Sequence, residues 1–490
     1  MPSVLLYFMY SLNIIFFIFV LFFENNNPKT RTAWLLIFVL LPGIGVFFYI
    51  LLSGHFFTSN KKMLKASKQS EKILMDYFAD NNKYLNGNIC NNPDIAGDYK
   101  QLIIHNAFYG KAPLTVNNSF EIFTSGKDKF KSLFNEIENA KKSIYLEYFI
   151  FRKDKTGREL LRLLEKKARE GITVRLLFDD MGSILTPLSF FLPLIKAGGK
   201  VSSFAPVRFG IIARINYRNH RKIAVIDDKT AYTGGINIGD EYANISDKKP
   251  EINWRDTSVK ITGDAVFFLQ KQFLIDWFSC QIRKNGSIEQ ELKELLSGSD
   301  TRGKAGEDNI ALQVVSSGPD DTENDEIEDS LIRLIFSAKK TLYIQSPYLT
   351  PDEKFFSAIK NAVNSGVDVR IMVPEKFDKW YVACAAYTNI PKFLKIGVKV
   401  YRYKDFIHSK TFVADSEAGS IGSTNIDSRS FSLHYETNVF FFNKEAGKLC
   451  TEIFMKDIES CEEDYLEWYT KKGVFIKALW GFASLFSPIM

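Results

Sequence analysis

Two stretches of this chain carry the same polar residues at the same spacing. The first, NHRKIAVIDDKTAYTGGIN, covers 219–237, and the second, IHSKTFVADSEAGSIGSTN, covers 407–425. The matching positions are His220/His408, Lys222/Lys410, Asp227/Asp415, Gly234/Gly422 and Asn237/Asn425. Side chains two apart on a strand share a face, so each His points the same way as its Lys. An imidazole beside an ammonium group forms a site for a phosphate.

Two such sites around one phosphorus predict a two-step displacement. One His attacks the phosphorus and forms a phosphohistidine, while the other, on the opposite side, protonates the leaving alcohol and then deprotonates the incoming alcohol or water. The two Lys neutralise the equatorial oxygens, and Asn237, Asn425 and the Gly-rich turns donate hydrogen bonds to them. We expect no metal and no other cofactor, because the lysines take the role that Mg²⁺ has in other phosphoryl enzymes.

Each His needs a carboxylate to orient its other ring nitrogen. WRDTSVK follows the first motif and HYETNVF the second, which aligns Asp256 with Glu436. The alignment predicts that Asp256 orients His220 and that Glu436 orients His408; ordinary salt-bridged acids are the alternative. Asp227 and Asp415 follow the end of their strands. A structural role is therefore expected for these two carboxylates more readily than a chemical one.

The elements that position these residues are also repeated in the sequence. AKKSIYLEYFIF (140–151) matches AKKTLYIQSPYL (338–349), and each expected strand precedes an amphipathic helix that ends on Gly and then a buried-type strand. The pattern predicts an α/β protein with two tandem β/α domains related by a pseudo-twofold axis, over 111–296 and 310–490. A polar linker covers 297–309. The polar segment 61–110 receives no fold assignment.

Two uncharged stretches near the N-terminus, 4–23 and 33–53, are long enough to cross a bilayer. They predict a transmembrane helical hairpin within 1–60, rather than a cleaved signal peptide or a buried hairpin. Lys residues after the second stretch place the bulk of the protein on the cytoplasmic side.

Composition limits the partners. The net charge of +6 fits anionic phospholipid and is too weak to require nucleic acid. Five scattered Cys, without C-x-x-C spacing, argue against disulfides and zinc. The tail KKGVFIKALWGFASLFSPIM (471–490) predicts either an interfacial membrane helix or a buried C-terminal helix.

At these residues the sequence resembles the phospholipase D superfamily, whose H-x-K-x4-D motif occurs here twice. Within it the chain resembles the bacterial cardiolipin synthases, in LLPGIG, VVSSGPD, LYIQSPYLTPD, IGSTNIDSRSF and the ending SLFSPIM. One departure is Gly235, where the superfamily commonly has Ser, as at Ser423, which adds Ser423 to the expected phosphate-binding residues. A backbone N–H can replace the hydroxyl at Gly235.

The resemblance implies a phosphatidyltransferase at the bacterial cell membrane. One phosphatidylglycerol would donate its phosphatidyl group to the glycerol headgroup of another, giving cardiolipin and glycerol, with His220 as the nucleophile by analogy. A membrane-bound phospholipase D-type hydrolase is the alternative, and a nuclease is disfavoured by the hairpin and the modest charge. A non-catalytic lipid-binding scaffold is the third hypothesis. The oligomeric state does not follow from the sequence, and the complete pair of motifs requires no dimer for chemistry.

Overall fold

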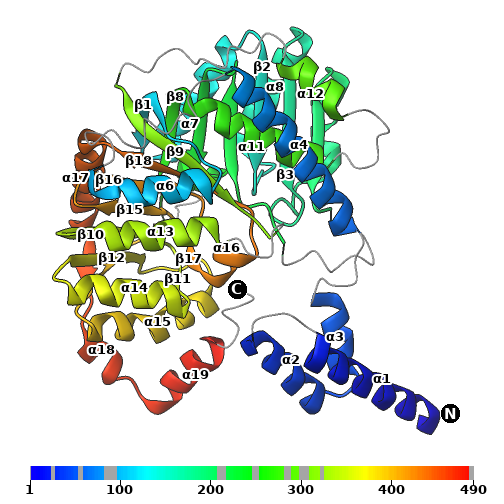
Figure 1. Cartoon of the computed structure of the whole chain (residues 1–490), viewed down its shortest axis with the longest axis vertical. Coiled ribbons are helices and arrows are strands. Elements are labelled where there is room, and N and C mark those ends of the chain that lie inside the picture. The colour runs from blue at the N-terminus through cyan, green and yellow to red at the C-terminus, as the bar shows by residue number, and fades with distance from the viewer. Residues whose placement is uncertain are drawn as a thin grey trace.

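One 15-stranded sheet runs through both halves of the protein in this computed structural model (Figure 1). The structure describes residues 2–23, 28–52, 59–81, 97–206, 217–245, 253–280, 288–296, 308–319 and 325–484. The strand order is β19-β13-β12-β10-β15-β16-β18-β9-β1-β8-β6-β5-β2-β3-β4. Apart from β19, this order is mirrored about the antiparallel pair β9–β1, so the repeat in the sequence becomes two similar half-sheets joined edge to edge.

The first half provides the strands from β1 to β8. They are β1 (Thr115–Phe123), β2 (Ser143–Tyr148), β3 (Thr173–Asp179), β4 (Lys200–Phe204), β5 (Lys222–Ile226), β6 (Thr230–Gly234), β7 (Trp254–Arg255) and β8 (Ser258–Gly263). Its helices are α4 (Ser59–Asn81), η3 (Gly97–Tyr99), α6 (Lys100–Phe108), α7 (Gly126–Asn139), α8 (Lys155–Arg169), η4 (Leu188–Phe191), α9 (Leu192–Lys196), α10 (Asp240–Ala243), α11 (Ala265–Ser279) and α12 (Ile288–Leu296).

The second half repeats this arrangement from β9 onward. Its strands are β9 (Ile310–Ser317), β10 (Thr341–Gln345), β11 (Leu349–Thr350), β12 (Asp368–Pro374), β13 (Lys399–Tyr403), β14 (Phe406–Ile407), β15 (Thr411–Ala414), β16 (Ala418–Gly422), β17 (Ile426–Asp427), β18 (Glu436–Phe442) and β19 (Cys461–Glu463). Its helices are α13 (Glu326–Ser337), α14 (Glu353–Asn364), α15 (Trp380–Lys395), α16 (Ser428–Ser432), α17 (Lys444–Ile458), α18 (Leu466–Thr470) and α19 (Val474–Ser484).

Helices cover both faces of the sheet, which explains the long apolar runs of its strands. On one face, α11 and α17 pack on the sheet in a single core that extends across both halves. On the other face, α7 and α8 form the core of the first half, and α13, α14 and α15 that of the second. All 15 residues of α11 are buried, because the sheet covers one side and α4 packs along the helix as well (Figure 1). The mixed α/β fold expected from the sequence is confirmed.

The segment 61–110, which received no fold assignment, contains most of α4 and all of η3 and α6. Its first part belongs to α4, whose Leu74 is buried in the same core as α11. Its last part forms α6, whose Leu102 and Ile103 pack in the core of the second half. Residues 82–96 and most of the predicted linker 297–309 lie outside the described residues. The predicted domain limits stay a prediction.

Three helices precede α4 along the chain: α1 (Pro2–Phe23), α2 (Pro28–Leu40) and α3 (Ile44–Leu52). The predicted second membrane span is therefore interrupted, at the Pro42–Gly43 turn. Asn13 on α1 supports this interruption, because its Nδ2 donates to Phe38 O at 3.1 Å and its Oδ1 accepts from Gly43 N at 3.3 Å. Over the described part of the chain, none of the helices combines the length and apolarity that crossing a membrane requires. The predicted transmembrane hairpin is not confirmed.

The C-terminal helix α19 has one buried and one exposed side. Trp480 and Ala483 are buried in the core of the second half, and α19 packs against α15. Phe475 is 92% exposed and Val474 81% exposed. One side of α19 is therefore buried, and membrane contact of the exposed side stays a prediction.

Candidate active site

Two short connections between the halves bring the duplicated motifs together. The β7 strand pairs in parallel with β14, through Trp254↔Phe406 and Arg255↔Ile407. On the other side of the pseudo-twofold axis, Asn219 forms a bridge with Tyr435. The backbone N–H of each motif His continues these connections, donating from His220 to Tyr435 O at 2.9 Å and from His408 to Arg255 O at 2.7 Å. Each His is therefore held beside the acidic segment of the opposite half.

The carboxylates that orient the histidines are consequently exchanged between the halves. His220 Nδ1 lies 3.0 Å from Glu436 Oε1, and His408 Nδ1 lies 2.7 Å from Asp256 Oδ2. Both acids contact a His, but the predicted pairs of Asp256 with His220 and Glu436 with His408 are wrong. The internal alignment identifies equivalent residues, whereas the strand pairing between the halves decides which of them face each other.

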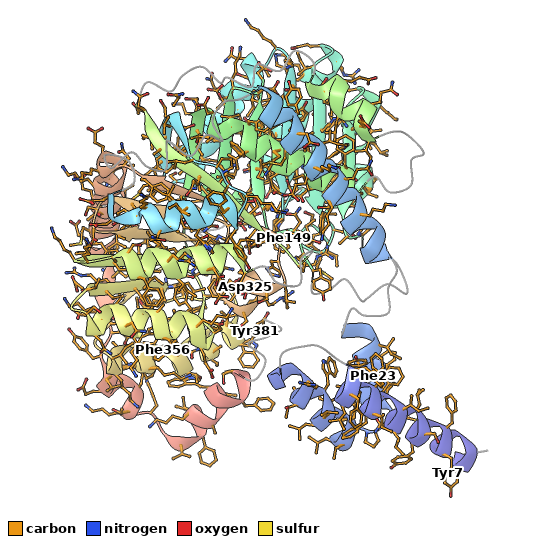
Figure 2. All side chains as sticks on the ribbon, viewed as in Figure 1. Tyr7, Phe23, Phe149, Asp325, Phe356 and Tyr381 are labelled. Carbon is orange, nitrogen blue, oxygen red and sulfur yellow. The ribbon has the colours of Figure 1, made fainter. Side chains whose placement is uncertain are left out.

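The motif lysines lie in the same buried site. Lys222 and Lys410 are both almost fully buried, and each Nζ donates to the carbonyl oxygen of its own motif His. The Phe149 ring stands edge-on to His220 with centroids 4.9 Å apart, and Lys222 Nζ lies 5.6 Å from the centre of the same ring. Figure 2 labels Phe149 where the two halves meet.

Electrostatics show that the two motifs form a single site. Burial lowers the pKa of His220 well below its usual value, and Lys222, Lys410 and His408 lower it further. Burial, together with Lys410, lowers the pKa of His408 to about 4. Both imidazoles are therefore neutral near pH 7 in the empty site, as a nucleophile must be.

Burial also destabilises the charged lysines. It lowers the pKa of Lys222 to about 7 and that of Lys410 to about 8. A bound phosphodiester anion would stabilise the charged form of both amines. The buried lysines therefore favour the binding of an anion in this site.

The expected phosphate-binding residues differ in what their side chains contact. Asn237 Oδ1 accepts from Ile150 N at 3.0 Å, and its Nδ2 donates to Tyr242 Oη at 2.8 Å, which leaves the second amide hydrogen. Asn425 is buried, and its Oδ1 has no hydrogen-bond partner among the described residues.

Ser423 contacts the acidic segment of its own half. Its hydroxyl donates to Glu436 Oε2 and accepts from Thr437 N at 3.0 Å. This hydroxyl therefore fixes the carboxylate that orients His220, and its expected contact with phosphate stays a prediction. At Gly235, an added Cβ would lie 2.1 Å from Asp256 Oδ1, so a Ser there would require the Asp256 side chain to move.

The motif carboxylates Asp227 and Asp415 tie hairpins to neighbouring loops. Asp227 accepts from the N–H groups of Lys141, Lys142 and Ser143 at 2.7 to 3.0 Å. Asp415 accepts from three equivalent N–H groups, those of 339–341, at 2.7 to 2.8 Å. Both residues have positive φ, near 54°, in the turn after the motif strand. Their contacts are those expected of structural residues.

Sequence reasoning missed the arginines beside the first motif. Arg218 forms a buried ion pair with Asp179 Oδ1 at 2.7 Å, and Asp179 Oδ2 accepts from Asn219 N at 2.9 Å. Arg221 donates from Nε to the carbonyl oxygen of Glu436 at 3.1 Å. These contacts fix the backbone on both sides of His220. The second half has Ser409 in place of Arg221, so the repeat itself gives no signal for it.

One group of potential metal ligands lies in the described part of the chain. Ligand atoms of His220, His434 and Glu436 lie within 4.8 Å of one another. Glu436 already pairs with His220, and the charges of Lys222 and Lys410 oppose a cation at this position. These residues do not fit a resident metal.

Comparison with known sequences identifies the family. The sequence profile described as the PLD-like domain of cardiolipin synthase matches residues 133–277 and 331–458. The chain belongs to the cardiolipin synthase family of phospholipase D-like proteins. A second profile, described as the N-terminal region of phospholipase D-nuclease, matches residues 11–54.

Individual relatives in this family match the chain along its length. Cardiolipin synthase 2 of Staphylococcus epidermidis is 37% identical over 100% of this chain and 98% of that protein. The cardiolipin synthase of Listeria monocytogenes is 36% identical, covering 98% of this chain and 97% of that protein. The crystal structure of a phosphatidylserine synthase from Haemophilus influenzae has a TM-score of 0.59 at 17% identity, covering 79% of this chain and 98% of the other, and supports the phospholipase D-like fold.

Proposed function

We propose that this chain is a cardiolipin synthase that transfers a phosphatidyl group from one phosphatidylglycerol to another. The observation that carries the proposal is the pair of buried histidines, each bonded to a carboxylate of the opposite half and each beside a lysine. Such a site can hold a phosphodiester between two imidazoles. Full-length similarity to proteins named cardiolipin synthase supports phosphatidylglycerol as the substrate.

In the first step, His220 Nε2 attacks phosphorus and the P–O bond to glycerol breaks. His408 gives its proton to the departing glycerol oxygen, leaving a phosphatidyl-histidine on His220. The proton is available because the bound phosphate anion raises the pKa of a neighbouring imidazole, which burial depresses in the empty site. Glu436 stabilises the charged ring that forms on His220.

In the second step, neutral His408 removes the proton from a hydroxyl of the second phosphatidylglycerol. The resulting alkoxide oxygen attacks phosphorus, and the P–N bond to His220 breaks to release cardiolipin. The charged Lys222 and Lys410 stabilise the equatorial oxygens in both steps. Asn237 and Asn425 supply amide hydrogens to the same oxygens.

The second candidate, a membrane phospholipase D-type hydrolase, uses the same residues with water as acceptor. The scaffold alternative would need neither His. We also propose that the protein is held in the bacterial cell membrane by the helices in 4–23 and 33–53, with its catalytic halves in the cytoplasm. The exposed apolar side of α1, for example Phe22 and Phe23 at 70% each, supports a lipid environment. The exposed side of α19 supports an additional interfacial contact.

The test uses purified full-length protein in mixed micelles with radiolabelled phosphatidylglycerol and excess EDTA, with lipids separated by thin-layer chromatography. Cardiolipin together with free glycerol is expected, and neither should form with His220→Ala or His408→Ala. Phosphatidic acid as the sole product would identify the hydrolase. Turnover that survives both substitutions would overturn the assignment of the site.

A further inference from the structure

A basic surface hollow of about 390 Å³ lies between α8 and the segment formed by η4 and α9. Lys153, Arg158 and Arg162 line it, and none of the three forms a salt bridge within the described part of the chain. Glu165, the acidic residue of the lining, pairs instead with Arg169 at 2.7 Å. Like charges one helical turn apart, as at Arg158 and Arg162, repel each other unless an anion lies between them.

An apolar ridge borders this hollow. It consists of Ile184, Leu185, Leu188, Leu192 and Ile195, which are 64%, 74%, 55%, 46% and 43% exposed. Phe190 and Phe191, from the same segment, are buried in the core and fix the ridge in place. Clustered exposed side chains of this size are unusual on a water-facing surface and mark a membrane or protein contact.

The ridge is attached to the rim of the active site. Ser183 Oγ donates to Phe149 O at 3.1 Å and accepts from Phe151 N at 2.9 Å. Thr186 Oγ1 donates to Phe151 O at 2.6 Å. Because Phe149 contacts His220, hydrogen bonds connect the ridge to the loop that borders the phosphate site.

The repeat shows that the fold does not require this hollow. When α8 is aligned with α14 at the Gly that follows each helix, Arg158 corresponds to Glu353 and Arg162 to Ser357. The second half therefore forms the same crossover without the paired arginines. Their presence in the first half calls for a role other than folding.

We infer that this rim of the first half docks on a bilayer that contains anionic phospholipid. A lipid phosphate occupies the hollow between Lys153, Arg158 and Arg162, while the ridge enters the boundary between headgroups and acyl chains. The site thereby opens next to the lipid surface that supplies its substrate. This inference adds a lipid contact distinct from the catalytic phosphate site and from the N-terminal helices.

The first test does not depend on turnover. The full-length Leu188→Cys variant is labelled with an environment-sensitive fluorophore and reconstituted in nanodiscs that contain a lipid spin-labelled near its headgroup. Quenching is expected for the label at 188. The matched control is Leu449→Cys on α17, where Leu449 is 42% exposed, and unsubstituted protein corrects for labelling of the native cysteines. Quenching at 188 no stronger than at 449 would overturn the inference and leave the ridge as a surface for a protein partner.

The second test asks whether the response to anionic lipid depends on the charges of Arg158 and Arg162. The rate at a fixed fraction of phosphatidylglycerol is compared in phosphatidylcholine and in phosphatidylserine nanodiscs. We expect wild type to gain severalfold with the anionic carrier, and Arg158→Glu/Arg162→Glu to lose that gain while Lys166→Glu/Lys360→Glu keeps it. An equal gain in both variants would refute the docking site. Absence of cardiolipin from wild type in every carrier would instead refute the proposed function, and the fluorescence test would still report on docking.

Discussion

The surroundings of the two motif histidines differ although the motifs themselves match. His220 contacts Glu436, whose carboxylate also binds the Ser423 hydroxyl, and the His434 ring lies 5.6 Å away. His408 contacts Asp256, whose carboxylate would have to move to admit a side chain at Gly235, and the Trp254 ring lies 5.5 Å from the His408 ring.

Duplication therefore preserved the proposed reacting groups and let the residues that support them diverge. Around His220, the longer acid Glu436 is combined with Ser423. Around His408, the shorter acid Asp256 is combined with Gly235. An equivalent position holds a polar His434 on one side and an apolar Trp254 on the other. Two chemically identical residues can therefore be given different tasks, as a nucleophile and a proton carrier require.

The strongest test of the comparison asks which His attacks. With phosphatidyl-p-nitrophenol, the leaving group needs no proton, so His408→Ala should still release one equivalent of nitrophenol in a burst. His220→Ala should give no burst. With phosphatidylglycerol, we expect both variants to lose about 10³-fold or more of the wild-type rate. A burst in His220→Ala and none in His408→Ala would reverse the two roles.

The exchanged carboxylates provide the next test. Glu436→Gln should slow the nitrophenol burst, as a defect at His220 would, and Asp256→Asn should slow only the turnover that follows. Each loss is expected to be about 10²- to 10⁴-fold, because the imidazole loses its orientation and the partner of its charged form. If Asp256→Asn affected the burst and Glu436→Gln did not, the carboxylates would act within their own halves.

The supports of the acids can be changed by a single group. A Cβ at 235 would displace Asp256, so Gly235→Ser should lower the rate about 10²-fold through misplacement of His408. Ser423→Gly removes one hydrogen bond to Glu436 and should cost about tenfold. Steady-state rates check both effects. Gly473→Ser serves as the control, since an added Cβ there meets nothing within 4 Å.

The lysines predict a smaller effect that depends on pH. Above a pKa of about 7 for Lys222 and about 8 for Lys410, the amines lose the charge that attracts the phosphodiester. We expect kcat/KM for phosphatidyl-p-nitrophenol, whose leaving group needs no proton from His408, to fall progressively from pH 7 to 9, whereas lysines of ordinary pKa would keep it level. A flat profile over this range would show that the empty site does not depress the lysine pKa values.

The motif aspartates should matter least for the rate. Asp227→Asn and Asp415→Asn each weaken a carboxylate that accepts three backbone N–H groups. We expect each variant to lose about 1–3 kcal/mol of unfolding free energy, with an unchanged rate per folded molecule. Thermal unfolding measures the first quantity and the rate of folded protein the second. A lost rate at full stability would instead give these residues a chemical role.

The sequence was sufficient to predict the α/β class and to mark the His and Lys residues that the structure brings together. Fixed spacing marked His220, Lys222, His408 and Lys410, because a motif within a few consecutive residues is a local pattern. The exchange of Asp256 and Glu436 could not be read in this way, since it depends on the β7–β14 pair and the 219–435 bridge, which join distant segments. The role of Ser423 depends in the same way on a contact across strands.

The helices outside the repeat were harder to predict. In α4 the polar face is wide, so the sequence did not show that Leu74 packs under it against α11. The turn at Pro42–Gly43 interrupts an apolar run, and Asn13, far away in sequence, supports it. Both features depend on contact with an element distant in the sequence, which a local pattern does not reveal.

The exchange of carboxylates also sets when during synthesis the enzyme can become active. His220 and Glu436 are separated by 216 residues along the chain. A ribosome that has completed only the first half presents a histidine and a lysine without the acid that orients the ring. Under the proposed mechanism, the nascent first half is therefore unable to cleave phospholipids, and competence arises in one event when the second half docks.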